Sequence, residues 1–395
     1  MSRWKLVRLK FGRGVAHFGE LGIGLEETSE RVRSDTLFSA WVSAYARLFS
    51  GTEVESLINR CKQPTPLFRL SSAFIYQQVN GELIEYLPRP LKFPQNYPIG
   101  DDLEFTKTFQ KLKYLPLSIW QRWYQGEGFT PDDRDELIAA TKGKATGSLT
   151  DAGTFAYSQA FKTQKLPKVA IDRTTRATNF YHTGVVSYRW ELVDGEIESR
   201  SGLYFLVEFP TKDTAFDQTF FAVLDFLGGE GLGGERSSGA GQFKVDYDDQ
   251  KSDQKSMEEN FNLTDEWKRA IEFPEGESHG LESHSLVSCL MSLFWTDDHD
   301  HLKALLPGMA LLPEGAASQA SYELQARGGW IASPSSNGRQ MRRQAVQMFT
   351  EGSVFPAEPS GKLADVTPNG FEQSSRGHKV YRSGIALSLP IKVKE

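Results

Sequence analysis

The sequence predicts an α+β fold built from two consecutive units, each interrupted by insertions. The chain has 395 residues, which is enough for two or three domains with cores of their own. Its composition, with 39% hydrophobic and 24% charged residues, is typical of a folded globular protein. Two stretches, one near the N-terminus and one beginning near Gly202, change from a period of two to a helical period. These two successions of strand and helix are the reason for predicting two units.

The first unit opens with an alternating strand at residues 4–11, one face of which is expected to meet water or a ligand. A helix follows at residues 34–49, with Ser34 placed to cap it and an acid in its first turn. Strand-like runs at residues 67–76 and 82–87 complete the order strand, helix, strand, strand.

Between about residue 91 and residue 168 no single period is sustained, so this stretch is predicted to be an insertion. The second unit starts with an alternating strand at residues 202–209, followed by a helix that Thr214 can cap. That helix ends in a glycine-rich turn, which leads into a further strand. A polar insertion at about residues 246–278 and several later strand candidates account for the remainder.

The sequence gives no indication of a membrane segment, a disulfide framework or a metal site. No stretch approaches 18 apolar residues, and the N-terminus lacks the apolar core of a signal peptide, so we expect a cytoplasmic protein without a membrane partner. Cys61 and Cys289 are expected to be small buried hydrophobic residues. The acidic and histidine-containing run at residues 297–301 is expected to be a solvated loop. We therefore expect neither a metal nor another cofactor.

The distribution of charge indicates a local basic surface. A formal net charge of −6 argues against a protein that coats nucleic acid by bulk attraction. Basic residues nevertheless concentrate between Lys142 and Arg176, interleaved with aromatic residues such as Phe161. This mixture suits single-stranded RNA, through phosphate contacts and base stacking. An exposed basic loop with scattered aromatic residues explains the same composition equally well.

Glycines crowd the segment from Gly231 to Gly241. Glycine allows positive φ, so successive N–H groups can converge on a phosphate. The segment leaves a predicted helix, enters a predicted strand and contains no GK[ST], which argues against a dinucleotide-binding loop and a P-loop. Two interpretations remain open: contact with phosphate or RNA, and a tight connection that needs glycine for its geometry alone.

His17 follows the first strand in a glycine-bordered loop. It can act as a base towards an RNA 2′-hydroxyl, or it can hydrogen-bond the backbone. Because a lone histidine is more often structural, the second role is the expected one.

Several segments, spread from end to end of the chain, occur in the order found in one known family. They are HFG at His17, SDTLFSAW at Ser34, RLSSAF at Arg69, LPRP at Leu87, KLKYLPL at Lys111, AIDRTTRAT at Ala170, GGEGLGGERSSGAGQF at Gly228, ELQARGGW at Glu323, MFTEGSVF at Met348 and VYRSGIALSLP at Val380. With these segments the chain resembles the RAMP superfamily of CRISPR-associated proteins, and within it the family of the fourth Csm subunit of type III-A effector complexes.

The resemblance implies two tandem ferredoxin-like (RRM-type) domains with a β-hairpin thumb. The first would span residues 1–200, with the thumb near residues 169–190, and the second residues 201–395, with the glycine-rich loop at residues 228–241. It also implies an RNA-binding structural subunit of antiviral defence. Such a subunit caps the 5′ handle of CRISPR RNA, contacts the large type III Cas subunit with polymerase-like palm domains, and abuts the repeating backbone RAMP subunit. It would meet target RNA only indirectly.

The RNA-binding residues expected from the patterns and the resemblance lie in the glycine-rich loop, in the thumb segment and at one histidine. They are Gly233, Gly234, Arg236, Ser237, Ser238, Gly239, Gly241, Asp172, Arg173, Thr174, Thr175, Arg176 and His17. Other RAMP proteins cleave CRISPR RNA precursors, so the alternative is a metal-independent endoribonuclease with His17 as general base. A third hypothesis is a structural bridge whose glycine-rich loop only shapes the edge of a sheet.

The isolated chain is expected not to cleave CRISPR precursor RNA, because no paired acid and base are apparent beyond His17. Labelled repeat RNA incubated with the chain, with and without divalent metal, should stay intact. Metal-free cutting that disappears in His17→Ala would instead support the nuclease.

Overall fold

The computed structural model describes residues 2–20, 24–98, 103–193, 196–246, 263–272, 286–307, 320–331, 341–371 and 378–394. Helices and antiparallel strand pairs alternate along these residues, which confirms the predicted α+β class. We refer to residues 2–246 as the N-terminal part and to residues 263–394 as the C-terminal part. The polar insertion expected at residues 246–278 lies largely outside the described residues.

The elements of the N-terminal part follow one another as β1 (Arg3–Lys10), β2 (Val15–Ala16), α1 (Ser34–Leu48), α2 (Gly51–Cys61), β3 (Arg69–Leu70), β4 (Phe74–Val79), β5 (Glu82–Pro88), α3 (Leu103–Lys111), β6 (Tyr114–Pro116), α4 (Leu117–Gln125), α5 (Pro131–Thr141), α6 (Ser148–Asp151), η1 (Tyr157–Gln159), β7 (Phe161–Ile171), β8 (Thr178–Tyr188), β9 (Trp190–Val193), β10 (Glu196–Phe209), α7 (Thr214–Glu230), η2 (Arg236–Ser238) and β11 (Lys244–Val245). Those of the C-terminal part are α8 (Asp265–Ile271), β12 (Val287–Leu290), α9 (His299–Leu305), β13 (Leu324–Arg327), β14 (Val346–Phe349), β15 (Val354–Phe355), β16 (Leu363–Asp365), β17 (Tyr381–Ser383) and β18 (Ser388–Ile391).

One sheet organises the N-terminal part, with the strand order β11-β1-β10-β4-β5-β6. Strand β1 lies between β10 and β11, and Leu6 stands opposite Leu206 in the register. Helix α1 follows β1, and helix α7 follows β10. The strands β1, β4, β10 and β11 with these two helices therefore follow a split β-α-β-β-α-β succession, and the elements from β5 to β9 are inserted into it.

The strand, helix and second strand that were expected to open the second unit pair with the first sheet. Strand β10 runs along β1 from the pair Arg3–Phe209 to the pair Leu9–Leu203, and β11 pairs with the other edge of β1. The pattern identified these elements, but it carried no information about their partner, because the pairing joins residues far apart in sequence. In the C-terminal part β15, β12 and β18 form a separate small sheet. The tandem ferredoxin-like arrangement stays a prediction.

The main sheet carries a hydrophobic core on each of its two faces. Val7 and Leu9 point towards α1 and α7, where Trp41 and Phe220 stack. On the opposite face Leu6 packs with residues of β12 and β18. The expectation that this second face meets water or a ligand is wrong, because the C-terminal part covers it.

Two helix caps differ from the sequence prediction. Ser34 and Thr214 are the first residues of α1 and α7, and the N-cap positions belong to Arg33 and Asp213. The Asp213 carboxylate accepts the N–H of Phe216, so it provides the cap that Thr214 was expected to give. The Ser34 hydroxyl instead accepts the N–H of Leu293 at 2.9 Å, which ties the start of α1 to the C-terminal part.

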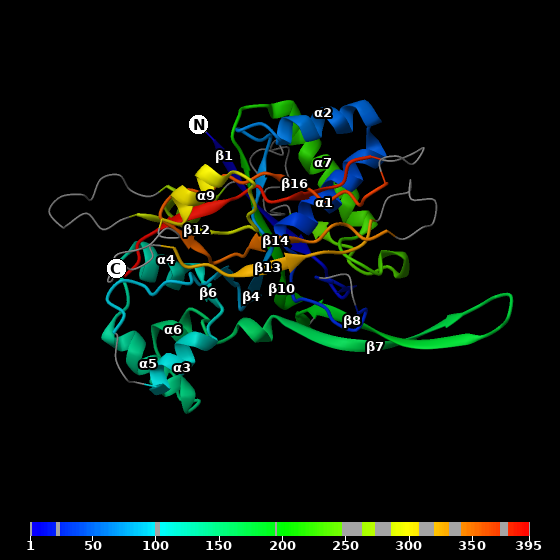
Figure 1. The fold of residues 1–395 in the computed structure, drawn as a ribbon. Helices are drawn as coiled ribbons and strands as arrows, with labels where there is room; N and C mark the ends of the chain where they lie inside the picture. Colours follow the sequence, from blue (N-terminus) through cyan, green and yellow to red (C-terminus); the bar gives the residue numbers. More distant parts are fainter. Residues whose placement is uncertain are drawn as a thin grey trace.

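The insertion contains a helical group and a long hairpin. Helices α3 to α6 pack at one side of the main sheet, and β7 and β8 project from the body of the protein as a two-stranded arm (Figure 1). The arm begins at Phe161, earlier in the chain than the thumb predicted near residues 169–190. Its outer part exposes Val169, Ile171 and Phe180.

Other expectations from the sequence can be compared directly with the structure. Cys61 and Cys289 are buried free cysteines, as predicted. The run at residues 297–301 is not a loop throughout, because Asp298 caps α9 with its side chain. Within the described residues no group of three or more His, Cys, Asp or Glu side chains is arranged to hold a metal ion. None of the helices that the structure describes has both the length and the apolar character needed to cross a bilayer.

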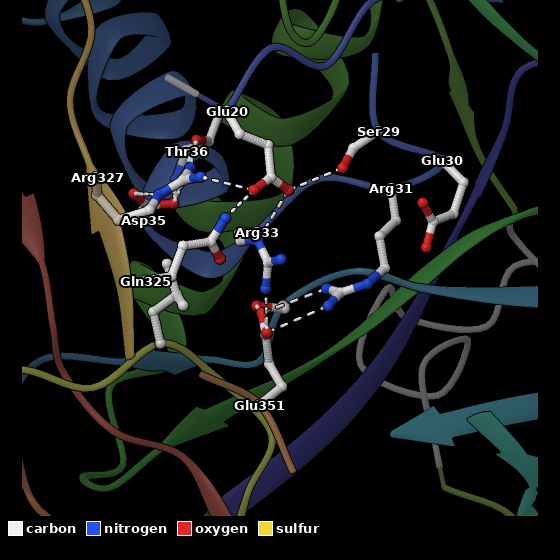
Figure 2. A network of polar contacts seen from close by, with 12 residues as sticks. Glu20, Ser29, Glu30, Arg31, Arg33, Asp35, Thr36, Gln325, Arg327 and Glu351 are labelled. Carbon is white, nitrogen blue, oxygen red and sulfur yellow. Dashed lines mark hydrogen bonds and ion pairs between the residues drawn. The ribbon is translucent and has the colours of Figure 1, made fainter. Parts of the chain in front are cut away.

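A buried ionic network joins the N-terminal part to the C-terminal part (Figure 2). Glu351, from the turn between β14 and β15, accepts a hydrogen bond from Arg31 at 3.1 Å and also contacts Arg33 and Ser72. Burial alone would raise the pKa of Glu351, but Arg31 and Arg33 outweigh it and hold the pKa well below its usual range. The C-terminal part thus contributes a carboxylate that two arginines of the N-terminal part neutralise.

At the start of α1 the roles are exchanged: the N-terminal part contributes the carboxylate, and the C-terminal part contributes the two arginines. Asp35 accepts two hydrogen bonds from Arg327, at 2.9 and 3.0 Å, and forms an ion pair with Arg382. Glu20 lies between the two pairs, 3.0 Å from Arg33 and 3.5 Å from Arg327. We call these residues together the ionic network: Glu20, Arg31, Arg33, Asp35, Arg327, Glu351 and Arg382.

Glu351→Gln is expected to lower the free energy of unfolding at pH 7 by about 3 to 5 kcal/mol, because it leaves Arg31 and Arg33 without their buried counter-charge. The folded-state pKa of Glu351 lies below the ordinary value of 4.5, so its contribution is complete above that pH and is lost as the pH falls below it. Urea unfolding of both proteins, repeated at decreasing pH, measures the difference and its decline.

Glu358→Gln is the matched control, since Glu358 belongs to the same part of the chain and its side chain is 72% exposed. Its unfolding free energy should stay within about 0.5 kcal/mol of the wild type. Equal effects of the two substitutions would contradict the stabilising role of Glu351.

Candidate nucleic-acid interface

The glycine-rich loop at residues 228–241 forms a compact turn between α7 and β11. Helix α7 ends at Glu230, and the residue that caps it, Gly231, has a φ of 87° that requires glycine. The short helix η2 follows, flanked by Glu235 and Gly239 in the left-handed conformation, with φ of 56° and 81°. Arg236, Ser237 and Ser238 of η2 are exposed, so this turn presents one guanidinium and two hydroxyl groups to solvent.

The glycines of this loop divide into two groups by what surrounds them. A Cβ atom at Gly233 would lie 2.3 Å from the carbonyl oxygen of His17, and one at Gly241 would lie 2.0 Å from that of Leu232. A Cβ at Gly234 would lie 2.6 Å from the His17 ring. A Cβ at Gly239 would meet nothing within 4 Å. Gly233, Gly234 and Gly241 are therefore required for the shape of the connection, whereas Gly239 faces open space.

His17 connects the loop to the base of the hairpin. Its buried ring donates from Nδ1 to the carbonyl oxygen of Gly184 in β8 at 2.7 Å, and since a carbonyl can only accept, Nδ1 carries the proton. The backbone carbonyl of His17 accepts the N–H of Gly234 at 2.8 Å. His17 thus holds three segments together, the role that the sequence favoured over catalysis.

The tip of the hairpin is ordered by its own backbone. The Asp172 carboxylate accepts the N–H of Thr174 at 2.8 Å and that of Thr175 at 3.3 Å, and these hydrogen bonds, the one from Thr174 above all, lower the pKa of Asp172. Arg176 has a positive φ of 56° and donates its N–H to the carbonyl of Asp172. Arg173 and Arg176 are exposed, and neither forms an ion pair with any residue that the structure describes.

The loop and the hairpin meet below the tip. Lys168 of β7 forms an ion pair with Glu235 and lies 3.4 Å from the hydroxyl of Ser238. Glu230, the other acid of the loop, pairs with Arg47 of α1. Cations of the same chain therefore neutralise both acids, which removes the repulsion that they would exert on an RNA phosphate. The structure brings together the loop, His17 and the part of the hairpin below its tip, while Arg173 and Arg176 lie in the turn that joins β7 to β8.

Sequence analysis missed a cavity of about 180 Å³ beside the loop. Among the described residues its charged lining consists of one acid, Glu20, and five arginines, namely Arg31, Arg33, Arg236, Arg327 and Arg343. Hydroxyl groups of α1 at Thr36, Ser39 and Ser43 also line it. Arg31 and Arg33 are two residues apart, so the sequence alone could have indicated that their side chains point to the same side of an extended segment. Nothing in the local sequence links them to Arg327 and Arg343, which come from the C-terminal part.

The electrostatics of the cavity favour an anion. Burial lowers the pKa of Arg343 to about 10, and the like charges of Arg382 and Arg327 add to this effect. Burial alone would raise the pKa of Glu20, but Arg33, Ser29 and Arg327 outweigh it, and the pKa is lowered. Glu20 is therefore ionised at neutral pH, and it is the one acid among the lining arginines. Such a lining can hold a phosphate oxygen by paired N–H donors.

Comparisons with known proteins show what the chain is similar to. A family model described as the CRISPR Csm4 C-terminal domain matches residues 289–391. A Csm4 protein of Methanocaldococcus jannaschii is 24% identical over 405 residues, which cover 96% of this chain and 95% of the relative. A Csm4 protein of Mycobacterium tuberculosis is 25% identical over 388 residues, which cover 98% and 97%. Among solved structures, a Csm1–Csm4 cassette in complex with pppApApA covers 100% of both chains, with a TM-score of 0.46 and 16% identity.

Proposed function

Because this chain is a Csm4-like protein of type III CRISPR systems, we propose that its part in the effector complex is to hold the 5′ handle of CRISPR RNA. In the same proposal it bridges the large palm-domain subunit and the repeating backbone subunits in antiviral defence, and it acts without catalysis. The ferredoxin-like identity of its domains belongs to this proposal as well. The β-α-β-β-α-β succession around β1 supports it for the N-terminal part.

The observation that carries the proposal is the cationic surface at the glycine-rich loop. The loop exposes Arg236, Ser237 and Ser238, its own acids are neutralised within the chain, and an arginine-lined cavity opens beside it. Guanidinium, hydroxyl and backbone N–H groups are the donors that position RNA phosphates and reach base edges. A sheet-edge connector has no need of this concentration of unpaired donors.

The bonds of His17 support binding over cleavage. A general base must reach the proton that it abstracts, and the His17 ring is buried with Nδ1 engaged by Gly184. Loss of His17 would disconnect the loop from the hairpin, so reduced RNA binding in His17→Ala is expected from its structural role.

Gly239→Val is expected to reduce the CRISPR RNA recovered with the purified complex while the protein remains folded. The added side chain meets nothing in the chain within 4 Å, but it occupies the space in front of η2 where RNA would approach. Copurified RNA per complex is the measurement, and circular dichroism reports the fold.

Gly81→Val provides the matched control for Gly239→Val. Gly81 has φ of 84°, close to the 81° of Gly239, and a Cβ there also meets nothing within 4 Å. It lies in the turn between β4 and β5, away from the loop, so the backbone strain is the same and the RNA content should not change. Equal RNA content in Gly239→Val and the wild type would identify the loop as a connector only.

The hairpin tip is expected to contact RNA without contributing to the fold. Arg173→Glu and Arg176→Glu remove exposed side chains without partners, so the thermal midpoint should hardly change. RNA binding should weaken, and each lost phosphate contact should reduce the slope of log affinity against log salt by about 0.7 to 1.

Lys107→Glu, on an exposed position of α3, is the control for a general effect of charge reversal. It should leave the affinity and the salt slope as they are in the wild type, apart from a small long-range effect. A double variant of Arg173 and Arg176 that binds RNA like the wild type would exclude the tip from the interface.

A further inference from the structure

The cavity beside the glycine-rich loop contains more positive charge than the chain neutralises. In the described part of the chain, the arginines at or next to the cavity number six, Arg31, Arg33, Arg236, Arg327, Arg343 and Arg382, and the carboxylates that act on them number four, Glu20, Glu30, Asp35 and Glu351. Asp35 and Glu351 are each shared by two arginines within the ionic network. Arg236 and Arg343 have no acidic partner in the described part of the chain, so a positive surplus remains at the cavity.

Buried donors around the cavity also lack acceptors. Arg327 is 2% exposed, and its Nη1 has no hydrogen-bond partner among the described residues; its ion-pair partner there, Oε2 of Glu20, lies 3.5 Å away. Arg382, which pairs with Asp35 and does not itself line the cavity, also has a buried Nε without a partner in this part of the chain. Folded proteins rarely leave buried donors of charged groups unsatisfied, because the cost of desolvation is then not recovered. Among the described residues the buried Nη1 donor of Arg327 thus has no acceptor, and it is available to a ligand in the cavity.

The dimensions and the lining fit a phosphate group. The cavity of about 180 Å³ exceeds the roughly 30 Å³ that one water molecule occupies in the liquid, so a tetrahedral oxyanion can enter with some of its hydration. A phosphate presents acceptor oxygens in several directions, which suits arginines that approach from different elements. Gly233 and Gly234 line the same space on the side of the loop.

We propose that this cavity is a phosphate-binding site shared by the two parts of the chain, in which one phosphate group lies among Arg236, Arg327 and Arg343. Its walls come from the glycine-rich loop and α1 on one side and from the C-terminal part on the other. A bound phosphate therefore links the two parts, and binding stabilises the folded chain in proportion to occupancy. The inference rests on the proposed function in one respect only: if the chain holds CRISPR RNA, the phosphate in the site is a phosphate group of that RNA.

The test measures the thermal midpoint of the full chain in chloride buffer, with and without inorganic phosphate at matched ionic strength. Phosphate should raise the midpoint of the wild type in a saturable way. Arg343→Gln should abolish most of the rise and weaken phosphate binding, measured by calorimetry, by about tenfold or more, as expected for one charge-assisted hydrogen bond. Without phosphate the midpoint of Arg343→Gln should stay close to that of the wild type, because the substitution removes repulsion from Arg327 and Arg382 together with the hydrogen bond from Arg343 Nε to the carbonyl oxygen of Trp330.

Two further variants separate the site from general effects. Arg236→Gln alters an exposed residue of η2, so it should fold normally and lose phosphate binding to a similar degree. Arg342→Gln removes an exposed neighbour that lies over the Trp330 ring, 5.1 Å from its centroid, and outside the cavity lining; it should keep the full response.

Three results would overturn the proposal. The first is the absence of a phosphate-specific rise in the wild type. The second is an undiminished rise in both Arg343→Gln and Arg236→Gln. The third is a lower midpoint of Arg343→Gln without phosphate, which would identify Arg343 as a structural residue.

Competition identifies the source of the phosphate. Single-stranded RNA that displaces phosphate from the wild type supports a nucleic-acid phosphate in the site. Displacement by adenosine monophosphate but not by RNA supports the site with a free phosphate compound as its ligand, and removes the RNA handle from it. RNA that binds the wild type and Arg343→Gln equally keeps the proposed function while rejecting the cavity as the place where RNA phosphate binds.

Discussion

The buried exchange of charge between the two parts of the chain is the constraint on which the rest of the structure depends. Each part offers one carboxylate to two arginines of the other, Glu351 to Arg31 and Arg33, and Asp35 to Arg327 and Arg382. Neither set can be buried alone, because unpaired charges in a protein interior are strongly unfavourable. Docking of the C-terminal part is therefore coupled to the position of α1, and α1 in turn forms one wall of the arginine-lined cavity.

The same coupling extends to the candidate interface through backbone contacts. His17 follows the first strand and holds the hairpin and the glycine-rich loop together. Its ring hydrogen-bonds the carbonyl oxygen of Gly184, and its own carbonyl oxygen accepts the N–H of Gly234. The close approaches at Gly233 and Gly241 leave the loop a single path. A rigid scaffold of this kind holds Arg236 and its neighbouring hydroxyls in fixed positions, which lowers the entropic cost of ordering them around a ligand. The exposed arm formed by β7 and β8 extends further from the body of the protein than the glycine-rich loop does (Figure 1).

Within the described residues, the acids of the glycine-rich loop are neutralised, whereas Arg236 of the same loop is not. Although the chain is acidic overall, with a formal net charge of −6, Glu230 and Glu235 are neutralised locally and the arginines beside them are not. The loop therefore attracts a polyanion although the chain as a whole is acidic. An acidic protein can bind RNA in this way without the indiscriminate binding that a basic one shows.

The sequence by itself determined the class of fold, several main strands and helices of the first sheet and the glycine-rich segment as a candidate interface, because these depend on local period and on residue type. Helix α7 was predicted from its first residue, whereas β10 begins at Glu196, six residues before the strand predicted at residues 202–209. Only the tertiary structure decided that β10 pairs with β1, that the C-terminal part covers the far face of the sheet, and that Arg327 and Arg343 join Arg33 at one cavity. The residues involved are separated by tens to hundreds of positions, and side-chain period specifies which face a residue occupies but not which distant segment will cover that face.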